Sequence, residues 1–202
     1  MAADALVLAT RNEGKLRELA RILGSHIKLT GLDAFPGAPD VPETGATFEA
    51  NALLKARAVA AYTGLPAVAD DSGLCVDVLN GMPGVLSARW AGQHGDDQAN
   101  LDLILAQVAD VPDARLGARF VCAAALVVPA GGDTREWVVT GEVEGRLIRA
   151  PRGSGGFGYD PIFVPDGFDL TTAEMTPEAK DAISHRGRAF RALAPFIQGR
   201  LT

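Results

Sequence analysis

Two different hydrophobic spacings follow each other without a gap at the start of the chain. Residues 4–12, DALVLATRN, have the apolar run of a short strand, and residues 13–23, EGKLRELARIL, have helical spacing. The apolar residues of the second segment fall on one predicted helical face: Leu16, Leu19, Ala20 and Leu23. A strand that passes directly into a helix begins a β-turn-α unit, and this constrains the chain to folds that combine both elements.

Strand-like and helix-like segments continue to alternate, in an irregular order, along the rest of the chain. Residues 47–64 predict a helix with Thr47 as its N-cap and Gly64 beyond its end. The later segments are a strand at 66–70, a helix at 96–110, paired strands at 118–129 and 134–145, and a helical C-terminal region interrupted near Ser184 and at Pro195. We expect an α/β fold with a mixed sheet, in one domain over residues 1–202.

Composition excludes several classes of protein. The chain has 48% hydrophobic and 22% charged residues, which is typical of folded, soluble proteins. Its apolar runs are shorter than the roughly 20 residues that span a bilayer, and its start has no secretion signal, so we expect a cytoplasmic protein without a membrane partner. Cys75 and Cys122, each in a strand-like segment, fit reduced core thiols better than a disulfide.

The charge balance limits the partners. A net charge of −6 without a cluster of Lys and Arg argues against binding to a nucleic acid polymer. A small anion remains possible where cations are gathered locally. The segment TRNEGK, residues 10–15, offers such a place: helix N-terminal amides with Thr10, Asn12 and Lys15 would make a phosphate cradle. The same residues also fit a plain turn followed by a solvated lysine, and they do not match a Walker A loop.

Residues 66–77, PAVADDSGLCVD, place Asp70 and Asp71 side by side at the predicted end of a strand. Such a carboxylate pair suits Mg²⁺, which prefers hard oxygen ligands and keeps waters, one of which can become a nucleophile. The alternative is an Asx turn in which Asp71 or Ser72 bonds to nearby backbone amides. Glu43, in a long loop, could approach the same place or remain an exposed loop charge.

Two further segments gather polar and aromatic groups. Residues 153–160, GSGGFGYD, contain G-x-G-x-x-G, but no helix follows, which disfavours a dinucleotide fingerprint. Phe157 there is either an aromatic platform for a base or part of an ordinary loop. Near the C-terminus, Lys180, His185 and Arg186 bring donors together, although Ser184 could simply cap a helix that begins at His185.

Taken together, these segments resemble the inosine triphosphate pyrophosphatase family, whose members hydrolyse non-standard purine nucleoside triphosphates such as ITP, dITP and XTP. The matching segments occur in order over nearly the whole chain: ATRNEGKLREL, PETGATFEANALLKA, ADDSGLCVDVLNGMPGVLSARWAG, GSGGFGYDPIFVP and EMTPEAKDAISHRGRAF. The resemblance implies an elongated α/β fold with a long mixed sheet, two lobes, an active-site cleft between them and a homodimer.

The resemblance also implies roles for individual residues. Asp71 would be the general base and a Mg²⁺ ligand, with Glu43 as the second metal carboxylate and Ser72 as a substrate contact. The residues implied for the triphosphate are Thr10, Arg11, Asn12, Glu13, Gly14 and Lys15, with Lys55 as a further phosphate contact. Those implied for the nucleoside are Phe157, Gly158, Tyr159, Asp160, Lys180, His185 and Arg186.

The implied reaction is hydrolysis of the triphosphate to monophosphate and pyrophosphate. It requires attack on the α-phosphorus, removal of a proton from water and neutralisation of the leaving group. Two other functions fit the same residues: a metal phosphohydrolase that releases orthophosphate, and a nucleotide-binding sensor without turnover. Identification of the products separates these three.

Overall fold

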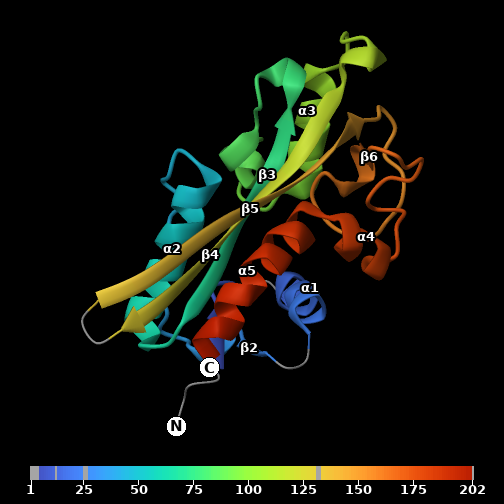
Figure 1. The fold of residues 1–202 in the computed structure, drawn as a ribbon. Helices are drawn as coiled ribbons and strands as arrows, with labels where there is room; N and C mark the ends of the chain where they lie inside the picture. Colours follow the sequence, from blue (N-terminus) through green and yellow to red (C-terminus); the bar gives the residue numbers. More distant parts are fainter. Residues whose placement is uncertain (1–4, 12, 25–26, 131–132, 202) are drawn as a thin grey trace. The chain divides into compact units, whose positions relative to one another are not determined.

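The computed structural model describes residues 5–11, 13–24, 27–130 and 133–201, and its named strands form a six-stranded sheet in the order β2-β1-β3-β4-β5-β6 (Figure 1). The strands are β1 (Ala5–Leu8), β2 (Lys28–Thr30), β3 (Ala67–Val76), β4 (Gly117–Ala130), β5 (Asp133–Leu147) and β6 (Phe163–Pro165). Strand β1 pairs in parallel with β2 and β3, whereas β5 and β6 are antiparallel. The predicted α/β fold with a mixed sheet is confirmed.

The helices begin and end largely where the sequence predicts. They are α1 (Glu13–Leu23), α2 (Phe48–Thr63), α3 (Asp97–Gln107), α4 (Pro177–Ile183) and α5 (His185–Leu201). The Thr47 hydroxyl accepts a hydrogen bond from the Ala50 amide, and Gly64 ends α2 with a left-handed φ of 67°. Local capping thus accounts for both ends of α2, as expected.

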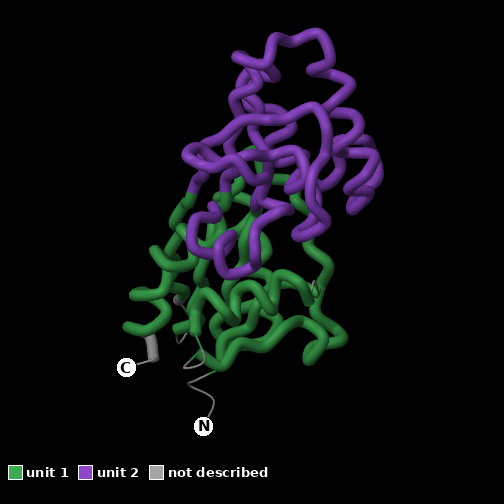
Figure 2. The backbone as a smooth tube through the Cα atoms, turned by 90° about the vertical axis from the view of Figure 1, so that its right-hand side faces the viewer, with its two compact units in different colours: residues 1–71, 122–141, 186–202 green, residues 72–121, 142–185 purple. Residues whose placement is uncertain are grey.

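The chain folds into two compact units, which Figure 2 colours separately. Unit 1 comprises residues 1–71, 122–141 and 186–202, and unit 2 comprises residues 72–121 and 142–185. Strands β3, β4 and β5 contribute residues to both units. The expectation of a single domain stays a prediction.

Each unit has its own hydrophobic core. In unit 1, Leu19 and Leu23 of α1 and Phe190 and Leu193 of α5 pack with Val68 of β3. The core of unit 2 is built from β3, α3, β4, β5 and the segment around β6, with these fully buried members: Leu74, Val76, Ile104, Ile162 and Phe163. Both free cysteines are buried, Cys75 in unit 2 and Cys122 in unit 1, as the sequence predicts.

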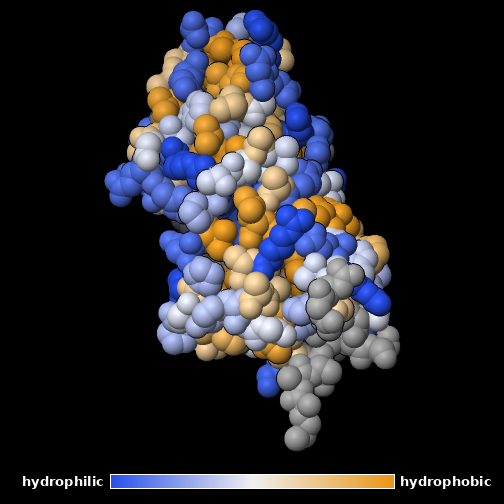
Figure 3. Space-filling view, turned by 90° about the vertical axis from the view of Figure 1, so that its left-hand side faces the viewer, coloured by the Kyte–Doolittle hydropathy of each residue, from blue (hydrophilic) through white to orange (hydrophobic). Residues whose placement is uncertain are grey.

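Apolar side chains also reach the surface. Figure 3 shows hydrophilic and hydrophobic side chains interspersed over one face. The large apolar residues that are exposed are Tyr62, Met82, Phe157, Phe168, Leu170 and Phe196. Within the part of the chain that the structure describes, the helices are all too short or too polar to cross a bilayer.

Two expectations about helices are wrong in detail. Ala20 was predicted to lie on the apolar face of α1 but is exposed. Glu18, which was not predicted to lie on that face, is buried. The reason is electrostatic, because Glu18 bonds to a buried arginine of α5. The predicted interruption at Pro195 is also absent: α5 continues through it, and Ile197 in the following turn is fully buried. Burial of that turn compensates for the backbone hydrogen bond that proline removes.

The strand predicted at 66–70 is too short, since β3 continues to Val76. Strand β3 pairs with β1 at two positions, Ala67 with Val7 and Val68 with Leu8. The pairing therefore stops two residues before Asp70. The carboxylate pair therefore lies within β3, just past the end of β1, and not at the end of its own strand. Ser72 and Gly73 resemble a turn in sequence, but the buried residues after them continue the strand.

Candidate active site

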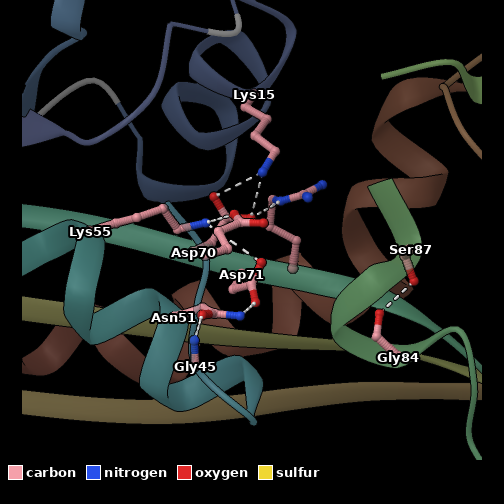
Figure 4. A network of polar contacts seen from close by, with 10 residues as sticks. Lys15, Gly45, Asn51, Lys55, Asp70, Asp71, Gly84 and Ser87 are labelled. Carbon is pink, nitrogen blue, oxygen red and sulfur yellow. Dashed lines mark hydrogen bonds and ion pairs between the residues drawn. The ribbon is translucent and has the colours of Figure 1, made fainter. Parts of the chain in front are cut away.

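Asp70 and Asp71 are adjacent in sequence but have different partners. Successive side chains of a strand point to opposite faces of the sheet. Asp70 accordingly contacts residues of α1 and α5, whereas Asp71 contacts residues of α2 (Figure 4). This alternation explains how two like charges can follow each other in a buried strand.

Asp70 is held between two cations of unit 1. Lys15, in the first turn of α1, places its Nζ 3.2 Å from Asp70 Oδ2 and 3.5 Å from Oδ1. Arg186, in the first turn of α5, donates from Nε to Asp70 Oδ2 at 3.1 Å and from Nη1 to Glu18 Oε2 at 3.0 Å. Arg186 is only 2% exposed, so this chain of alternating charges is shielded from water.

This pairing keeps Asp70 ionised. Burial alone would raise the pKa of its carboxyl group, but Lys15, Arg186 and Lys55 together hold that pKa well below its usual range. Burial likewise opposes the charge on Arg186, and the carboxylates of Asp70 and Glu18 outweigh it and raise the arginine pKa. Asp70 is therefore a fixed negative charge that positions Lys15.

Asp71 faces a second group of polar residues. Its Oδ2 accepts a hydrogen bond of 2.9 Å from Asn51 Nδ2, and its Oδ1 lies 3.5 Å from Lys55 Nζ. The same Lys55 ammonium donates to Glu43 Oε1 at 2.5 Å. Of the two positions that the sequence left open for Glu43, the structure shows the approach to Asp71, with Lys55 contacting both carboxylates. The metal role of Glu43 stays a prediction.

Asn51 joins the loop that carries Glu43 to this group. Its Oδ1 accepts from the Gly45 amide at 2.7 Å while its Nδ2 donates to Asp71 (Figure 4). Asn51 is completely buried in α2, and both ends of its amide are used. A Cβ at Gly45 would approach Asn51 Oδ1 at 2.7 Å, so a glycine permits this close contact.

The environment of Asp71 shifts its pKa in the opposite direction from that of Asp70. Burial raises the pKa of Asp71 to about 6, with Lys55 opposing the rise and Glu43 adding to it. For Lys55, burial lowers the pKa, but the charges of Asp71, Asp70 and Glu43 outweigh it and raise the value above normal. Two neighbouring carboxylates whose pKa values are driven apart are a recognised feature of acid-base sites.

The carboxylates around Asp71 are candidate ligands for Mg²⁺. Within residues 5–11, 13–24, 27–130 and 133–201, no group of three or more His, Cys, Asp or Glu side chains could hold a metal ion. Mg²⁺ in nucleotide sites, however, takes one or two carboxylates together with substrate phosphates and water. Asp71 and Glu43 provide two hard carboxylates already facing one cation, Lys55, and therefore fit such an ion.

The other residues predicted for the triphosphate lead from β1 into α1. Arg11 donates to the Ala38 carbonyl at 2.9 Å, and Glu13 is exposed and pairs with Arg17 one turn later. The Thr10 carbonyl accepts from the Leu32 amide, and Gly14 is exposed in the first turn of α1. Asn12 lies outside the described residues. Within this segment, Lys15 contacts Asp70 of the aspartate pair.

Unit 2 brings together three residues predicted for the nucleoside. Asp160 is buried, and its Oδ2 accepts from the Phe157 amide at 2.8 Å and from Lys180 Nζ at 2.5 Å. Lys180 Nζ also lies 5.5 Å from the centroid of the Phe157 ring, and that side chain is 45% exposed. The buried Asp160 carboxylate therefore bonds to the backbone of the loop, while the Phe157 ring is partly exposed to solvent.

Three more of the predicted residues also lie in unit 2. Tyr159 is buried and donates from its hydroxyl to the Ser87 carbonyl at 2.8 Å; burial and then the charge of Asp97 raise its pKa. His185 stacks on Phe120 with ring centroids 4.9 Å apart. Ser72 is half-buried in β3. The substrate roles predicted for all these residues stay predictions.

Two residues of the site were missed in the sequence. Asn51 had a signal: it is a polar residue among the apolar positions of a predicted helix, and a buried amide there must have partners. Glu18 had none, because it lies off the apolar face of the predicted first helix and its partner Arg186 is 168 residues away. Its Oε1 is buried and has no hydrogen-bond partner among the residues that the structure describes.

Comparison with known proteins supports the resemblance found in the sequence. The model of the Ham1 family matches residues 6–196. The chain is 63% identical over 196 residues to the dITP/XTP pyrophosphatase of Streptomyces coelicolor, covering 96% of each chain. It is 62% identical to the protein of the same name from Nocardia farcinica, over 95% of this chain and 94% of that one.

Solved structures agree. The nucleoside-triphosphatase / dITP/XTP pyrophosphatase of Mycobacterium abscessus superposes with a TM-score of 0.76 at 59% identity, over 95% of this chain and 99% of that one. A HAM1 protein from Coxiella burnetii gives 0.86 at 41% identity, over 96% and 98%. A match over almost the full length in sequence and fold establishes the identification: the chain belongs to the Ham1 family.

Proposed function

We propose that this chain hydrolyses dITP and XTP, and also ITP, to the nucleoside monophosphate and pyrophosphate. Relatives that are 63% and 62% identical over nearly the whole chain are named dITP/XTP pyrophosphatases. The reaction removes non-standard purine nucleotides from the nucleotide pool. We assign the phosphate chemistry to the aspartate pair and lysines of unit 1, and recognition of the base to the loop of residues 153–160 in unit 2.

The observation that carries the proposal is the opposite shift in pKa of two adjacent aspartates. Asp70 is held ionised by Lys15 and Arg186, whereas burial raises the pKa of Asp71 to about 6. A general base is most effective when its pKa lies near the working pH, because it is then both deprotonated and able to take up a proton. Asp71 meets that condition and Asp70 does not.

In the proposed reaction, a water oxygen attacks the α-phosphorus and its proton passes to Asp71. The bond from the α-phosphorus to the bridging oxygen breaks, and pyrophosphate leaves with the bonding electrons. Lys15 and Lys55 bind phosphate oxygens and offset the charge that develops on the leaving group. Asp71 and Glu43 would hold Mg²⁺, which when bound supplies further neutralisation of the phosphates.

The nucleoside would be bound by residues of the loop in unit 2. Phe157 can stack on any purine, so stacking adds affinity with little selectivity. Selectivity is expected from donors such as Lys180, which can pair with the 6-oxo group of hypoxanthine or xanthine but not with the 6-amino group of adenine. Loss of one such hydrogen bond to the base is expected to cost roughly 1 kcal/mol, which disfavours ATP.

The test is a panel of ITP, dITP, XTP, GTP and ATP assayed with and without Mg²⁺ in water enriched in ¹⁸O. We expect monophosphate and pyrophosphate from the first three, with ¹⁸O in the monophosphate because attack occurs at the α-phosphorus. Release of orthophosphate would instead identify the other phosphohydrolase chemistry. Binding without products would identify a sensor.

We also propose that the enzyme is a cytoplasmic homodimer, as the family resemblance implies. Light scattering coupled to size-exclusion chromatography should give a mass about twice that of the 21.0 kDa chain. A mass equal to that of one chain over the micromolar range would rule out the dimer.

A further inference from the structure

The glycine-rich loop of unit 2 is held to helix α3 by a carboxylate that no part of the proposed reaction uses. Asp97, the first residue of α3, accepts a hydrogen bond of 2.9 Å at Oδ2 from the Gly158 amide. The neighbouring amide, that of Phe157, donates to Asp160 Oδ2 at 2.8 Å. Two consecutive amides of the loop are therefore each bonded to a carboxylate.

These two bonds enclose one residue, Phe157. Peptide groups are planar, so the orientation of a residue's Cβ depends on the two peptide planes on either side of its Cα. One of those planes carries the Phe157 amide and the other carries the Gly158 amide. Asp160 fixes the first plane and Asp97 fixes the second, which together define the direction in which the Phe157 side chain leaves the backbone.

The loop backbone allows this arrangement only because of its glycines. Gly158, whose amide bonds to Asp97, has a left-handed φ of 62°, a conformation that glycine adopts at no steric cost. Gly156 also has a positive φ, and a Cβ there would collide with the Asp160 carboxylate. The sequence around Phe157 is thus adapted to bring both carboxylates to the backbone.

Packing alone does not hold the loop against α3. A pocket of about 200 Å³ lies between them, lined by Asp97, Gln98 and Leu101 of α3 and by residues 154–158 and Pro161. A loop beside an open pocket can move into it unless directed bonds prevent this. Asp97 and Gly158 both line this pocket, and the hydrogen bond between them joins α3 to the loop.

We propose that Asp97 is a positioning residue for binding of the base: it fixes the loop so that Phe157 is preorganised to stack on the purine. This inference rests on the proposed function, because it assigns Phe157 to the base. When the ring is preorganised, binding does not lose free energy to ordering of the loop. Loss of Asp97 should therefore weaken binding of the base and leave phosphate binding unchanged.

The experiment compares the parent with Asp97→Ala, Asp97→Asn and Asp96→Ala. Asparagine retains an oxygen acceptor for the Gly158 amide. Asp96 caps α3 through the Ala99 amide and has no described bond to the loop, so Asp96→Ala is the control for a weakened helix end. Each variant is assayed with dITP, and inorganic tripolyphosphate serves as an inhibitor that lacks a base.

We expect Asp97→Ala to raise KM for dITP about three- to tenfold, the range for loss of one partly exposed hydrogen bond. Its kcat and its inhibition by tripolyphosphate should match the parent, and Asp97→Asn and Asp96→Ala should retain the parent KM. An unchanged KM in Asp97→Ala would overturn the proposal. So would an equal loss of tripolyphosphate binding, or the same KM change in Asp96→Ala, because each indicates a general structural effect.

Hydrogen exchange provides a readout that does not require activity. The peptide covering residues 155–159 should exchange faster in Asp97→Ala than in the parent, at a parent-like rate in the other two variants. Unchanged exchange would overturn the role of Asp97 even in an active enzyme. A parent that does not hydrolyse dITP would refute the proposed function instead, and the exchange result would still decide whether Asp97 holds the loop.

Discussion

Replacement of Arg186 by methionine tests whether the buried charge network of unit 1 is as important as its geometry indicates. Arg186 is 2% exposed and bonds to both Asp70 and Glu18, so its loss leaves two buried carboxylates with fewer partners. Breaking a buried pair in this way costs roughly 3–5 kcal/mol. For a chain of this size, each kcal/mol lowers Tm by about 2–4 °C, which predicts a decrease of roughly 6–20 °C.

Arg57→Met is the matched control. Arg57 donates two hydrogen bonds to Glu136, at 2.8 and 2.6 Å, but its side chain is 51% exposed. An exposed pair contributes about 1 kcal/mol or less, so Tm should fall by no more than about 4 °C despite the shorter distances. Burial, and not bond length, should therefore decide the difference between the two variants.

The pH dependence of the Arg186→Met defect provides a second check. A carboxyl group with a depressed folded pKa stabilises the fold above its unfolded pKa, about 3.9, and loses that effect as the pH falls. The variant retains Lys15 near Asp70 but loses the arginine, so burial then raises the Asp70 pKa. The difference in Tm between the parent and Arg186→Met should be largest at pH 7. It should be smaller at pH 4, where Asp70 of the variant begins to protonate. If Arg186→Met lowers Tm at pH 7 by no more than Arg57→Met does, the reasoning is refuted.

Three further results follow from the site. The kcat/KM for dITP should fall as the pH drops below about 6, because the base form of Asp71 is then lost; a flat profile from pH 5 to 8 would contradict this. In Lys55→Met, kcat/KM should begin to fall at a higher pH than in the parent, since the Lys55 charge lowers the Asp71 pKa. A fall that begins at the same pH as in the parent, or at a lower pH, would contradict this. Lys15→Ala should raise the inhibition constant of tripolyphosphate, and an unchanged constant would remove Lys15 from phosphate binding.

Much of the fold follows from local patterns in the sequence. The cap at Thr47, the left-handed Gly64 and the start of α5 at His185 agree with expectation because each depends on a few neighbouring residues. The extent of β3 and the continuation of α5 through Pro195 were not predictable in this way. Both depend on burial by segments distant in sequence, which outweighs the local turn and proline signals.

The candidate site shows the same division. Adjacent carboxylates and a loop glutamate favoured a Mg²⁺ site. The structure brings Glu43 and Asp71 to the same lysine, Lys55, and the Mg²⁺ site stays a prediction. The different partners of Asp70 and Asp71 were not predictable, since Arg186 is 116 residues from Asp70. Asp97 is similarly remote from Gly158, by 61 residues, and its sequence context predicted only a helix start.

The most direct test of the account is the turnover of dITP by Asp71→Asn at saturating substrate and pH 7.5. The substitution removes the proposed general base and metal carboxylate while preserving the shape of the side chain. We expect kcat to fall by about two orders of magnitude or more, with Tm close to that of the parent. A folded Asp71→Asn variant with the parent kcat would contradict the assignment of Asp71 as the base, and with it the proposed division of roles between the two aspartates.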